Sequence, residues 1–229
     1  MRKLAIVGYG KMGKLIEQLA PQYDLEVALK LDEFNNANQA GITKENFAGI
    51  DVAIEFSIPS AVPSNVADIA SLGVNLVVGT TGWLEHLPAV KGIIDSEGTG
   101  LVWSPNFSIG IHIFVRLVAE AARLMDVEPA YGSWAWEIHH SAKKDAPSGT
   151  LLKLVDEMKK AGYTRDIDVG SNRAGAIPGT HEIGFDSSAD TITLRHTARS
   201  REGFARGALK AANWIAGKKG FYEFSEIEF

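Results

Sequence analysis

Short apolar runs alternate with amphipathic segments along the first half of the chain. The apolar runs end in glycine or polar residues, as strands buried in a sheet usually do, and the segments between them have helical spacing. In chain order the expected elements span residues 4–7, 12–19, 25–31, 52–56, 61–72, 76–78, 87–94 and 101–103. This alternation of strand and helix predicts an α/β fold with a doubly wound parallel sheet.

The pattern changes after residue 107. One long amphipathic helix is expected at residues 108–125, with Ile109, Ile113, Val115, Leu117, Val118 and Leu124 as its apolar members. Three strand-like runs follow at 133–139, 181–185 and 191–197, and no helical segment separates the last two. We therefore predict a smaller α+β unit. A final helix at about 204–216 and the tail at 221–229 are expected to return to the first unit.

Length and composition fit two modest domains of a globular protein. The chain has 229 residues, of which 45% are apolar and 22% are charged, and these fractions are ordinary. It contains no cysteine, which removes thiolate chemistry and fits a reducing compartment. The first apolar run is too short for a signal peptide or a membrane span. With a net charge of −5, we expect a cytoplasmic protein without a membrane or nucleic-acid surface.

A glycine-rich motif follows the first expected strand. Residues 8–13 read Gly8-Tyr9-Gly10-Lys11-Met12-Gly13. In the dinucleotide-binding fingerprint, the first glycine allows a tight turn, the second lets the backbone approach a pyrophosphate, and the third allows close packing of helix on strand. The phosphates then lie at a helix N-terminus. Because the motif directly follows a strand, it predicts dinucleotide binding at the start of the chain.

The cofactor preference depends on the end of the second strand. An acid there accepts a hydrogen bond from the ribose 2′-hydroxyl of NAD, and a base suits the 2′-phosphate of NADP. Lys30, Asp32 and Glu33 compete at this point, and Lys11 adds a second basic group. We expect NADPH to be preferred, with NADH as a second cofactor. The alternative is that both lysines are solvated surface residues.

A second cluster of polar residues lies between residues 137 and 150, where the chain reads Glu-Ile-His-His-Ser-Ala-Lys-Lys-Asp-Ala-Pro-Ser-Gly-Thr. Ser148 or Thr150 can cap the helix that follows, and the N–H groups of Gly149 and Thr150 can face a carboxylate. His139 and His140 lie on opposite faces if a strand continues through them. With Lys143 beside them, the cluster indicates proton donation to a small dianion, and metal-ligand spacing is missing.

This cluster resembles the signature of the 4-hydroxy-tetrahydrodipicolinate reductase (dihydrodipicolinate reductase) family of the lysine and diaminopimelate pathway. Four further segments are similar to that family in the same order over nearly the whole chain. They are Gly79-Thr-Thr-Gly82, Ser104-Pro-Asn-Phe-Ser108, Arg173-Ala-Gly175 and the C-terminal helix. The resemblance implies a Rossmann domain at residues 1–107 and 200–229. It also implies a domain at 108–199 that binds a dicarboxylate substrate and forms a homotetramer.

The resemblance also implies roles for particular residues. A hydride would pass from the nicotinamide to C4 of the substrate ring, with His139 as the acid–base residue and Lys143 as the proton donor. His140, Ser148, Gly149 and Thr150 would hold the substrate. The cofactor would contact the glycine loop, Lys30 and two later segments, which consist of Gly79, Thr80, Thr81, Ser104, Pro105, Asn106 and Phe107. No metal ion is expected.

Some features depart from the family pattern. The glycine loop is one residue shorter than the loop common in the family, and Lys30 stands where an acid is frequent. The chain is also shorter between residues 30 and 51, so a helix and a strand are expected to be trimmed there. Two other functions stay open: a different NAD(P)-dependent reductase, and a dinucleotide sensor without catalysis.

Overall fold

The computed structural model describes residues 1–227 and divides the chain into two compact units. Unit 1 consists of Met1–Ser108 and Glu202–Phe229, and unit 2 consists of Ile109–Arg201. The chain therefore leaves unit 1 once and returns to it once. These boundaries differ by one or two residues from the division expected from the sequence.

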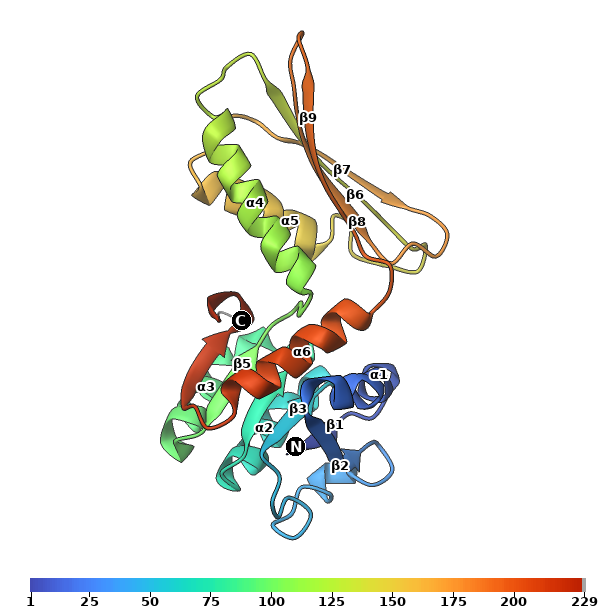
Figure 1. The fold of residues 1–229 in the computed structure, drawn as a ribbon, viewed down its shortest axis with the longest axis vertical. Coiled ribbons are helices and arrows are strands. Elements are labelled where there is room, and N and C mark those ends of the chain that lie inside the picture. The colour runs from blue at the N-terminus through green and yellow to red at the C-terminus, as the bar shows by residue number, and fades with distance from the viewer. Residues whose placement is uncertain (228–229) are drawn as a thin grey trace. The chain divides into compact units, whose positions relative to one another are not determined.

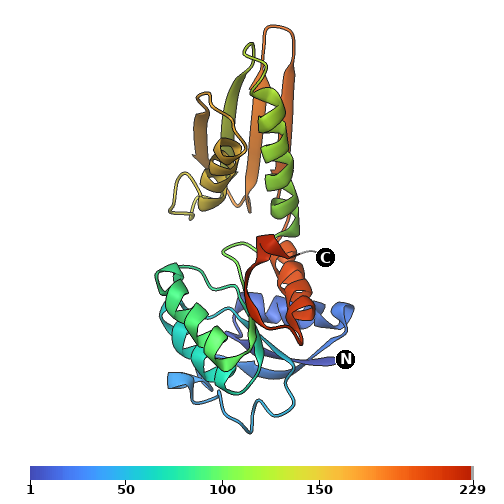
Figure 2. The same cartoon turned by 90° about the vertical axis from the view of Figure 1, so that its left-hand side faces the viewer.

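Unit 1 is built on a six-stranded sheet in the order β10-β5-β4-β3-β1-β2, in which every pair of neighbours is parallel. The strands are β1 (Arg2–Val7), β2 (Leu25–Leu31), β3 (Val52–Glu55), β4 (Asn75–Val78), β5 (Gly100–Trp103) and β10 (Gly220–Glu223). The helices are α1 (Lys11–Leu19), α2 (Val62–Ser71), α3 (Leu87–Glu97) and α6 (Glu202–Ile215). Figures 1 and 2 show α1 and α6 on one face and α2 and α3 on the other. The predicted doubly wound sheet is confirmed.

Burial explains why the central strands have no polar face. All residues of β3 and β4 are buried, as expected for strands covered by helices on both sides. On the α6 side, Gly207 lets the helix approach the chain closely, because a Cβ there would lie 1.8 Å from the Phe107 carbonyl oxygen. The returning helix is thus part of the core of unit 1. Between Leu31 and β3 the structure has a single short 3₁₀ helix, η2 (Ala37–Gln39).

Unit 2 is a four-stranded mixed sheet in the order β7-β6-β8-β9. Its strands are β6 (Gly132–His139), β7 (Asp168–Arg173), β8 (Thr180–Asp186) and β9 (Thr191–Thr197), and its helices are α4 (Ile109–Met125) and α5 (Gly149–Lys160). Both helices cover the same face of the sheet (Figures 1 and 2). Phe114 and Val118 of α4 pack there with Leu154 of α5 and with Ile183 and Phe185 of β8. The predicted α+β unit is confirmed.

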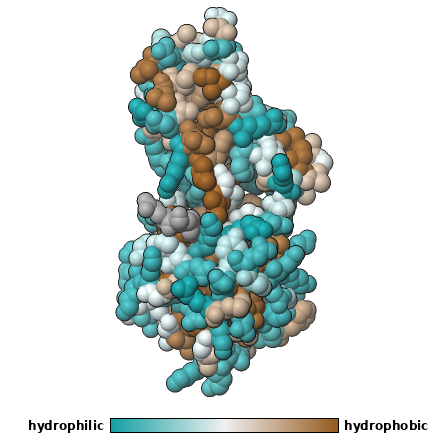
Figure 3. Space-filling model, in the orientation of Figure 1, coloured by the Kyte–Doolittle hydropathy of each residue, from teal (hydrophilic) through white to brown (hydrophobic). Residues whose placement is uncertain are grey.

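Two details of unit 2 differ from the sequence-based expectation. Strand β7 was not predicted, because its sequence Asp-Val-Gly-Ser-Asn-Arg lacks apolar alternation and the strand is held at the sheet edge by parallel pairing with β6. In α4, Ile113, Leu117 and Leu124 are more than half exposed. Apolar side chains accordingly form a brown band on this unit in Figure 3.

Candidate active site

Unit 1 contains a cavity of about 770 Å³ at the carboxyl ends of β1 and β2. Gly8, Tyr9 and Gly10 line it, together with Asp32 and Glu33 from the segment after β2. In open α/β sheets, this edge is where ligands bind. The structure therefore brings the glycine loop and the acids after the second strand together around one hollow.

The three glycines of the loop have different surroundings. Gly8 has a φ of +94°, and a Cβ there would lie 2.2 Å from the Phe56 carbonyl oxygen. An added Cβ at Gly10 would meet nothing within 4 Å, whereas one at Gly13 would lie 2.8 Å from the Gly8 oxygen. The loop thus turns at Gly8, stays open at Gly10 and packs tightly at Gly13. This geometry fits a dinucleotide pyrophosphate over Gly10, at the start of α1.

The lysines expected near the cofactor do not line this cavity. The Lys30 Nζ lies 2.9 Å from the Glu17 Oε1 and 5.1 Å from the centre of the Tyr9 ring. Lys11 is the first residue of α1 and is exposed, and Met12 is half-buried behind it. The cavity edge is acidic at this point.

Asp32 is fixed at that edge. Its Oδ1 accepts hydrogen bonds from the N–H groups of Phe34 (2.9 Å) and Asn35 (3.2 Å).

The other residues expected to contact the cofactor follow β4 and β5. The Gly79 N–H bonds the Glu55 carbonyl oxygen at 2.9 Å, and the Ser104 N–H bonds the Val78 oxygen at 3.2 Å, so the two segments lie at adjacent strand ends. Thr81, Pro105 and Asn106 are at least partly exposed, but Thr80, Ser104 and Phe107 are buried. The Phe107 and Phe224 rings pack together with their centres 4.7 Å apart. The Phe107 side chain therefore belongs to the core.

A buried acid, Glu55, lies at the end of β3. Its Oε1 accepts hydrogen bonds from the N–H (3.1 Å) and hydroxyl of Ser57 and from the Asn65 amide (3.4 Å). These partners are neutral. Burial in these surroundings raises the pKa of the Glu55 carboxyl above its ordinary value, which favours the uncharged acid. Since Ser57 and Asn65 also line the cavity, this acid lies beside a hollow suited to an anion.

The histidines and the lysine of the second cluster lie at the end of β6 in unit 2. His139 is the last residue of the strand and is 7% exposed, and His140 follows it and is half-buried. The Lys143 N–H bonds the His140 carbonyl oxygen at 3.1 Å, so the chain turns directly after the strand. The Lys143 Nζ lies 2.8 Å from the Asp145 Oδ1.

Helix α5 begins where this turn ends. Ser148 is its N-cap, and the Ser148 Oγ accepts a hydrogen bond from the Leu151 N–H at 3.2 Å. Gly149 is exposed and Thr150 is half-buried in the first turn. The Lys143 ammonium, followed by smaller contributions that include the Gly149 N–H, lowers the pKa of the Asp145 carboxyl. A carboxylate of the protein is thus stabilised at the place where a substrate carboxylate was expected.

The sequence analysis missed the residue at the centre of this cluster. Glu137 of β6 is fully buried, and its Oε1 accepts hydrogen bonds from the Ser148 N–H (2.8 Å), the Ser171 hydroxyl (2.8 Å) and the Arg173 guanidinium (2.9 Å). The Ser148 hydroxyl donates to the Glu137 Oε2. Alternation along β6 placed Glu137 on the same face as His139, which was the available signal. Two of its partners, Ser171 and Arg173, come from a distant segment.

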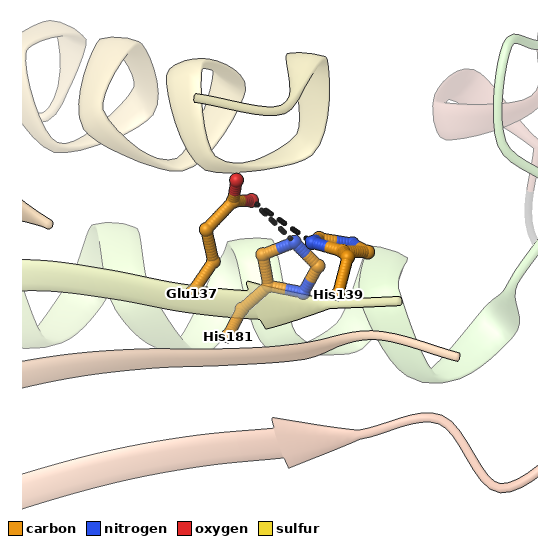
Figure 4. A group of neighbouring side chains, drawn as sticks. All are labelled: Glu137, His139 and His181. Carbon is orange, nitrogen blue, oxygen red and sulfur yellow. Dashed lines mark ion pairs between the residues drawn. The ribbon is translucent and has the colours of Figure 1, made fainter. Parts of the chain in front are cut away.

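Two imidazoles approach the same carboxylate (Figure 4). The Glu137 Oε2 lies 3.6 Å from the His139 Nδ1 and 3.4 Å from the His181 Nε2. The two rings meet edge to face, with their centres 5.0 Å apart. His181, on β8, is 4% exposed and was not expected from the sequence. The three ligand atoms lie within 4.8 Å of one another, a spacing that a metal ion can bridge.

The surroundings separate the protonation states of these groups. Burial alone would raise the pKa of Glu137, but hydrogen bonds from Ser148, Ser171 and Arg173 lower it to about 2. Burial, reinforced by the neighbouring His139, lowers the pKa of His181 to about 4. Burial is also the main reason that the pKa of His139 is lowered. Near neutral pH, an ionised Glu137 therefore faces two uncharged imidazoles.

Models of one family match both halves of the chain. The model described as dihydrodipicolinate reductase, N-terminus, matches residues 2–107, and the one described as dihydrodipicolinate reductase, C-terminus, matches residues 110–227. Two similar curated proteins are named 4-hydroxy-tetrahydrodipicolinate reductase. The protein from Christiangramia forsetii is 34% identical and covers 98% of this chain and 96% of its own. The protein from Thermosipho africanus is 36% identical, with 98% and 97% covered.

Solved structures agree on the fold. A dipicolinate-bound dihydrodipicolinate reductase from Paenisporosarcina sp. TG-14 has a TM-score of 0.80 at 22% identity, with both chains covered completely. A DAP dehydrogenase from C. glutamicum has a TM-score of 0.56 at 12% identity, with 99% of this chain and 94% of that chain covered. In residues 1–227, no helix is long and apolar enough to cross a membrane. On the matches to both of its halves, the chain belongs to the dihydrodipicolinate reductase family.

Proposed function

We propose that this chain catalyses the NAD(P)H-dependent reduction of 4-hydroxy-tetrahydrodipicolinate, via dihydrodipicolinate, to tetrahydrodipicolinate in lysine and diaminopimelate biosynthesis. The observation that carries this proposal is the family match over both units. Two features support it: a glycine-lined cavity in unit 1, and a lysine beside a helix N-terminus in unit 2. The family background also supports a cytoplasmic location.

Residues after β6 would bind the substrate. The Asp145 carboxylate, held by Lys143, marks a place where a carboxylate is stabilised. A substrate carboxylate would exchange with Asp145 there and accept hydrogen bonds from the N–H groups of Gly149 and Thr150. His140 and the capping Ser148 would complete the contacts. A bound dianion needs such partners, because an unpaired charge taken out of water costs several kcal/mol.

Lys143 would supply the proton. The nicotinamide, when bound, supplies the hydride that is delivered to C4 of the substrate ring. Hydride delivery makes the ring electron-rich, and a cationic acid stabilises that developing charge most strongly in the transition state. Lys143 is a cation in reach of a carboxylate, whereas the lowered pKa of His139 keeps its imidazole uncharged near neutral pH. This supports Lys143 as the donor and His139 as the acid–base residue beside it.

Unit 1 would accept both NADH and NADPH, with NADH preferred. Asp32 lines the cavity directly after β2, where an acid bonds the ribose 2′-hydroxyl and repels a 2′-phosphate. The expected preference for NADPH depended on Lys30 and Lys11. Lys30 is paired with Glu17, and neither lysine lines the cavity. The acidic edge therefore supports the reverse order.

We also propose that the chain forms a homotetramer through the open face of the four-stranded sheet. Trp134, Trp136 and Ile138 alternate along β6 with the buried Ala135, Glu137 and His139, so they lie on the face opposite α4 and α5. All three are half-buried within unit 2. Aromatic residues on a sheet face are typical of protein interfaces. Sedimentation of the wild type and of Trp134→Glu tests this: a tetramer in both would contradict the proposed face.

The reductase activity is tested by following the absorbance of NADH and NADPH separately. The substrate is made in place by its synthase from pyruvate and aspartate semialdehyde. We expect rapid oxidation that requires the synthase and is faster with NADH. Tight cofactor binding without turnover would contradict the enzyme and favour the dinucleotide sensor.

A further inference from the structure

Glu137 connects three elements that carry the proposed substrate site. It belongs to β6, it accepts hydrogen bonds from Ser171 and Arg173 of β7, and it accepts two more from Ser148, the N-cap of α5. The carboxylate therefore fixes the first turn of α5 against the end of β6. The anion-binding turn and His139 are held by the same buried group.

The carboxylate also restricts the proton positions of the imidazoles. An ionised carboxylate only accepts hydrogen bonds, so a ring nitrogen that faces it carries the hydrogen. The His139 Nδ1 is buried and has no hydrogen-bond partner among residues 1–227, and the Glu137 Oε2 lies 3.6 Å from it. A shortening of a few tenths of an ångström makes this a hydrogen bond. In an uncharged His139 the hydrogen is then on Nδ1, and Nε2 has the free lone pair.

A glycine leaves room at that second nitrogen. Gly179 has a φ of +153°, and a Cβ at this position would lie 2.8 Å from the His139 Nε2. Any side chain there would displace the imidazole. Glycine at this position thus keeps the Nε2 side of the ring free of a neighbouring side chain.

We infer that Glu137 is a positioning residue of the reductase: it holds His139 in the tautomer with the hydrogen on Nδ1 and fastens the anion-binding turn of α5 to the same strand. The catalytic consequence depends on the proposed function, whereas the tautomer does not. The rings of His139 and His181 share one carboxylate oxygen, which limits how far either can rotate.

The charges around Glu137 favour this role over metal binding. Charged groups surround His139 and the Glu137 carboxylate. Arg173 faces them from β7, and Lys143 and Asp145 face them from the turn after β6. His181 faces them from β8, and His196 of β9 lies beside His181. The Arg173 guanidinium already pairs with Glu137 at 2.9 Å. A divalent cation placed between the carboxylate and the two imidazoles would be repelled by this arginine and by Lys143.

The first test uses the unaltered protein. Long-range ¹H–¹⁵N NMR of the imidazoles, assigned with His139→Gln, identifies which ring nitrogen carries the hydrogen. We expect His139 to be protonated on Nδ1 near neutral pH. A hydrogen on Nε2 would overturn the inference, whether or not the protein is an active reductase.

The second test compares Glu137→Gln with Ser171→Ala. Glu137→Gln replaces the carboxylate by an amide that can donate to Nδ1, and we expect kcat to fall about 10²-fold. The His139 tautomer should become mixed. The acid limb of the kcat profile should move to lower pH, because the anion that favours the imidazolium is lost. Ser171→Ala removes one hydrogen bond to the same carboxylate and keeps its charge, so kcat should stay within about tenfold of wild type.

The remaining outcomes are also decisive. An unchanged tautomer and an unchanged acid limb in a folded Glu137→Gln variant would reduce Glu137 to a structural residue and overturn the inference. Binding of Zn²⁺ alone in equilibrium dialysis, with loss of that binding in Glu137→Gln and activity dependent on the metal, would overturn it in favour of a metal site. No oxidation by the wild type, with the expected tautomer, would contradict the proposed function alone.

Discussion

Within residues 1–227 each unit buries one glutamate completely, and the surroundings shift the pKa values of these two acids in opposite directions. Glu55 in unit 1 contacts only neutral groups through its hydrogen bonds, and burial raises its pKa. Glu137 in unit 2 is equally inaccessible, but Ser148, Ser171 and the Arg173 guanidinium lower its pKa to about 2. Burial alone therefore does not decide whether an acid is ionised. The partners decide it.

The opposite pKa shifts of Glu55 and Glu137 match the functions proposed for the two units. Unit 1 is proposed to bind a dinucleotide in its cavity, and the raised pKa of the acid beside that cavity weakens its repulsion toward phosphates. Unit 2 is proposed to transfer protons and bind a dicarboxylate, and the Glu137 carboxylate there can orient imidazoles and a guanidinium. The comparison predicts that chemistry, stability and cofactor choice respond separately to substitutions in the two units.

The largest expected effect separates chemistry from cofactor binding. Lys143→Ala removes the proposed proton donor from unit 2, and we expect kcat to fall by ~10²–10⁴. The Kd for NADH, measured by fluorescence titration, should stay within about twofold, because general acid catalysis acts only in the chemical step. Lys144→Ala is the matched control, since Lys144 is an exposed neighbour. A loss of NADH affinity as large as the loss of rate would contradict the separation.

The next effect compares the two acids directly. Glu137→Gln should lower the free energy of unfolding by about 3 kcal/mol, because it leaves Arg173 without its buried partner. Glu55→Gln should instead raise it, because the amide keeps the shape of the acid and removes a carboxyl group whose ionised form is disfavoured by burial. Urea unfolding at neutral pH measures both. A loss for Glu55→Gln as large as that for Glu137→Gln would contradict the raised pKa of Glu55.

Stability should also depend on pH in opposite directions for the two acids. The native pKa of Glu137 is lowered, so its contribution is present above pH 4.5 and is lost as the pH falls toward 2. The native pKa of His181 is lowered from 6.5 to about 4, so the folded protein loses stability as the pH falls through that interval. The pKa of Glu55 is raised, so its contribution is present below pH 4.5 and is lost as the pH rises through the native value.

Urea unfolding at a series of pH values, for the wild type and both glutamine variants, isolates each contribution. Each pKa unit corresponds to roughly 1.4 kcal/mol. If both substitutions change the pH dependence of stability in the same direction, the opposite pKa shifts of the two acids are contradicted.

The smallest expected effect lies in unit 1 alone. Asp32→Asn removes the acid that would repel a 2′-phosphate, and we expect the ratio of kcat/KM for NADPH to that for NADH to rise by about tenfold. Lys30→Ala should leave this ratio unchanged, because Lys30 is paired with Glu17. Initial rates with both cofactors measure it. A fall in the ratio on removing Lys30 would restore the original assignment of this lysine as a phosphate contact.

The sequence predicted the parts of the fold that depend on local patterns. The buried strands β3 and β4 are continuous apolar runs, and the glycine loop directly follows β1, so both could be placed within a residue or two. The polar strand β7 could not, because pairing with β6 holds it in place. In α4 the pattern predicted the helix but not its buried side, since Ile113 and Leu117 are apolar and exposed.

The candidate site was predictable only where its residues are neighbours in sequence. His139, Lys143 and Ser148 lie within one short segment, and their resemblance to a known signature assigned their roles. Arg173 and His181 reach Glu137 from other strands, and only the pairing of β6 with β7 and β8 brings them there. The carboxylate was in the quoted motif from the start, but Ser171 and His181, two of its partners, lay outside every segment singled out for the site. The role of a buried charged residue can therefore be inferred only once the residues that pair with it are known.

The order of synthesis follows from the return of α6 and β10 to unit 1. Strand β10 pairs with β5, and α6 packs near Phe107, so the sheet that begins at β1 lacks an edge strand and a covering helix until the ribosome has translated unit 2. Unit 2 is a continuous segment and has all of its strands earlier. During translation, the domain that is started first would therefore be completed last. A growing chain would expose the α6 side of this sheet until α6 and β10 have packed onto it, and exposed apolar surface of this kind is prone to aggregation.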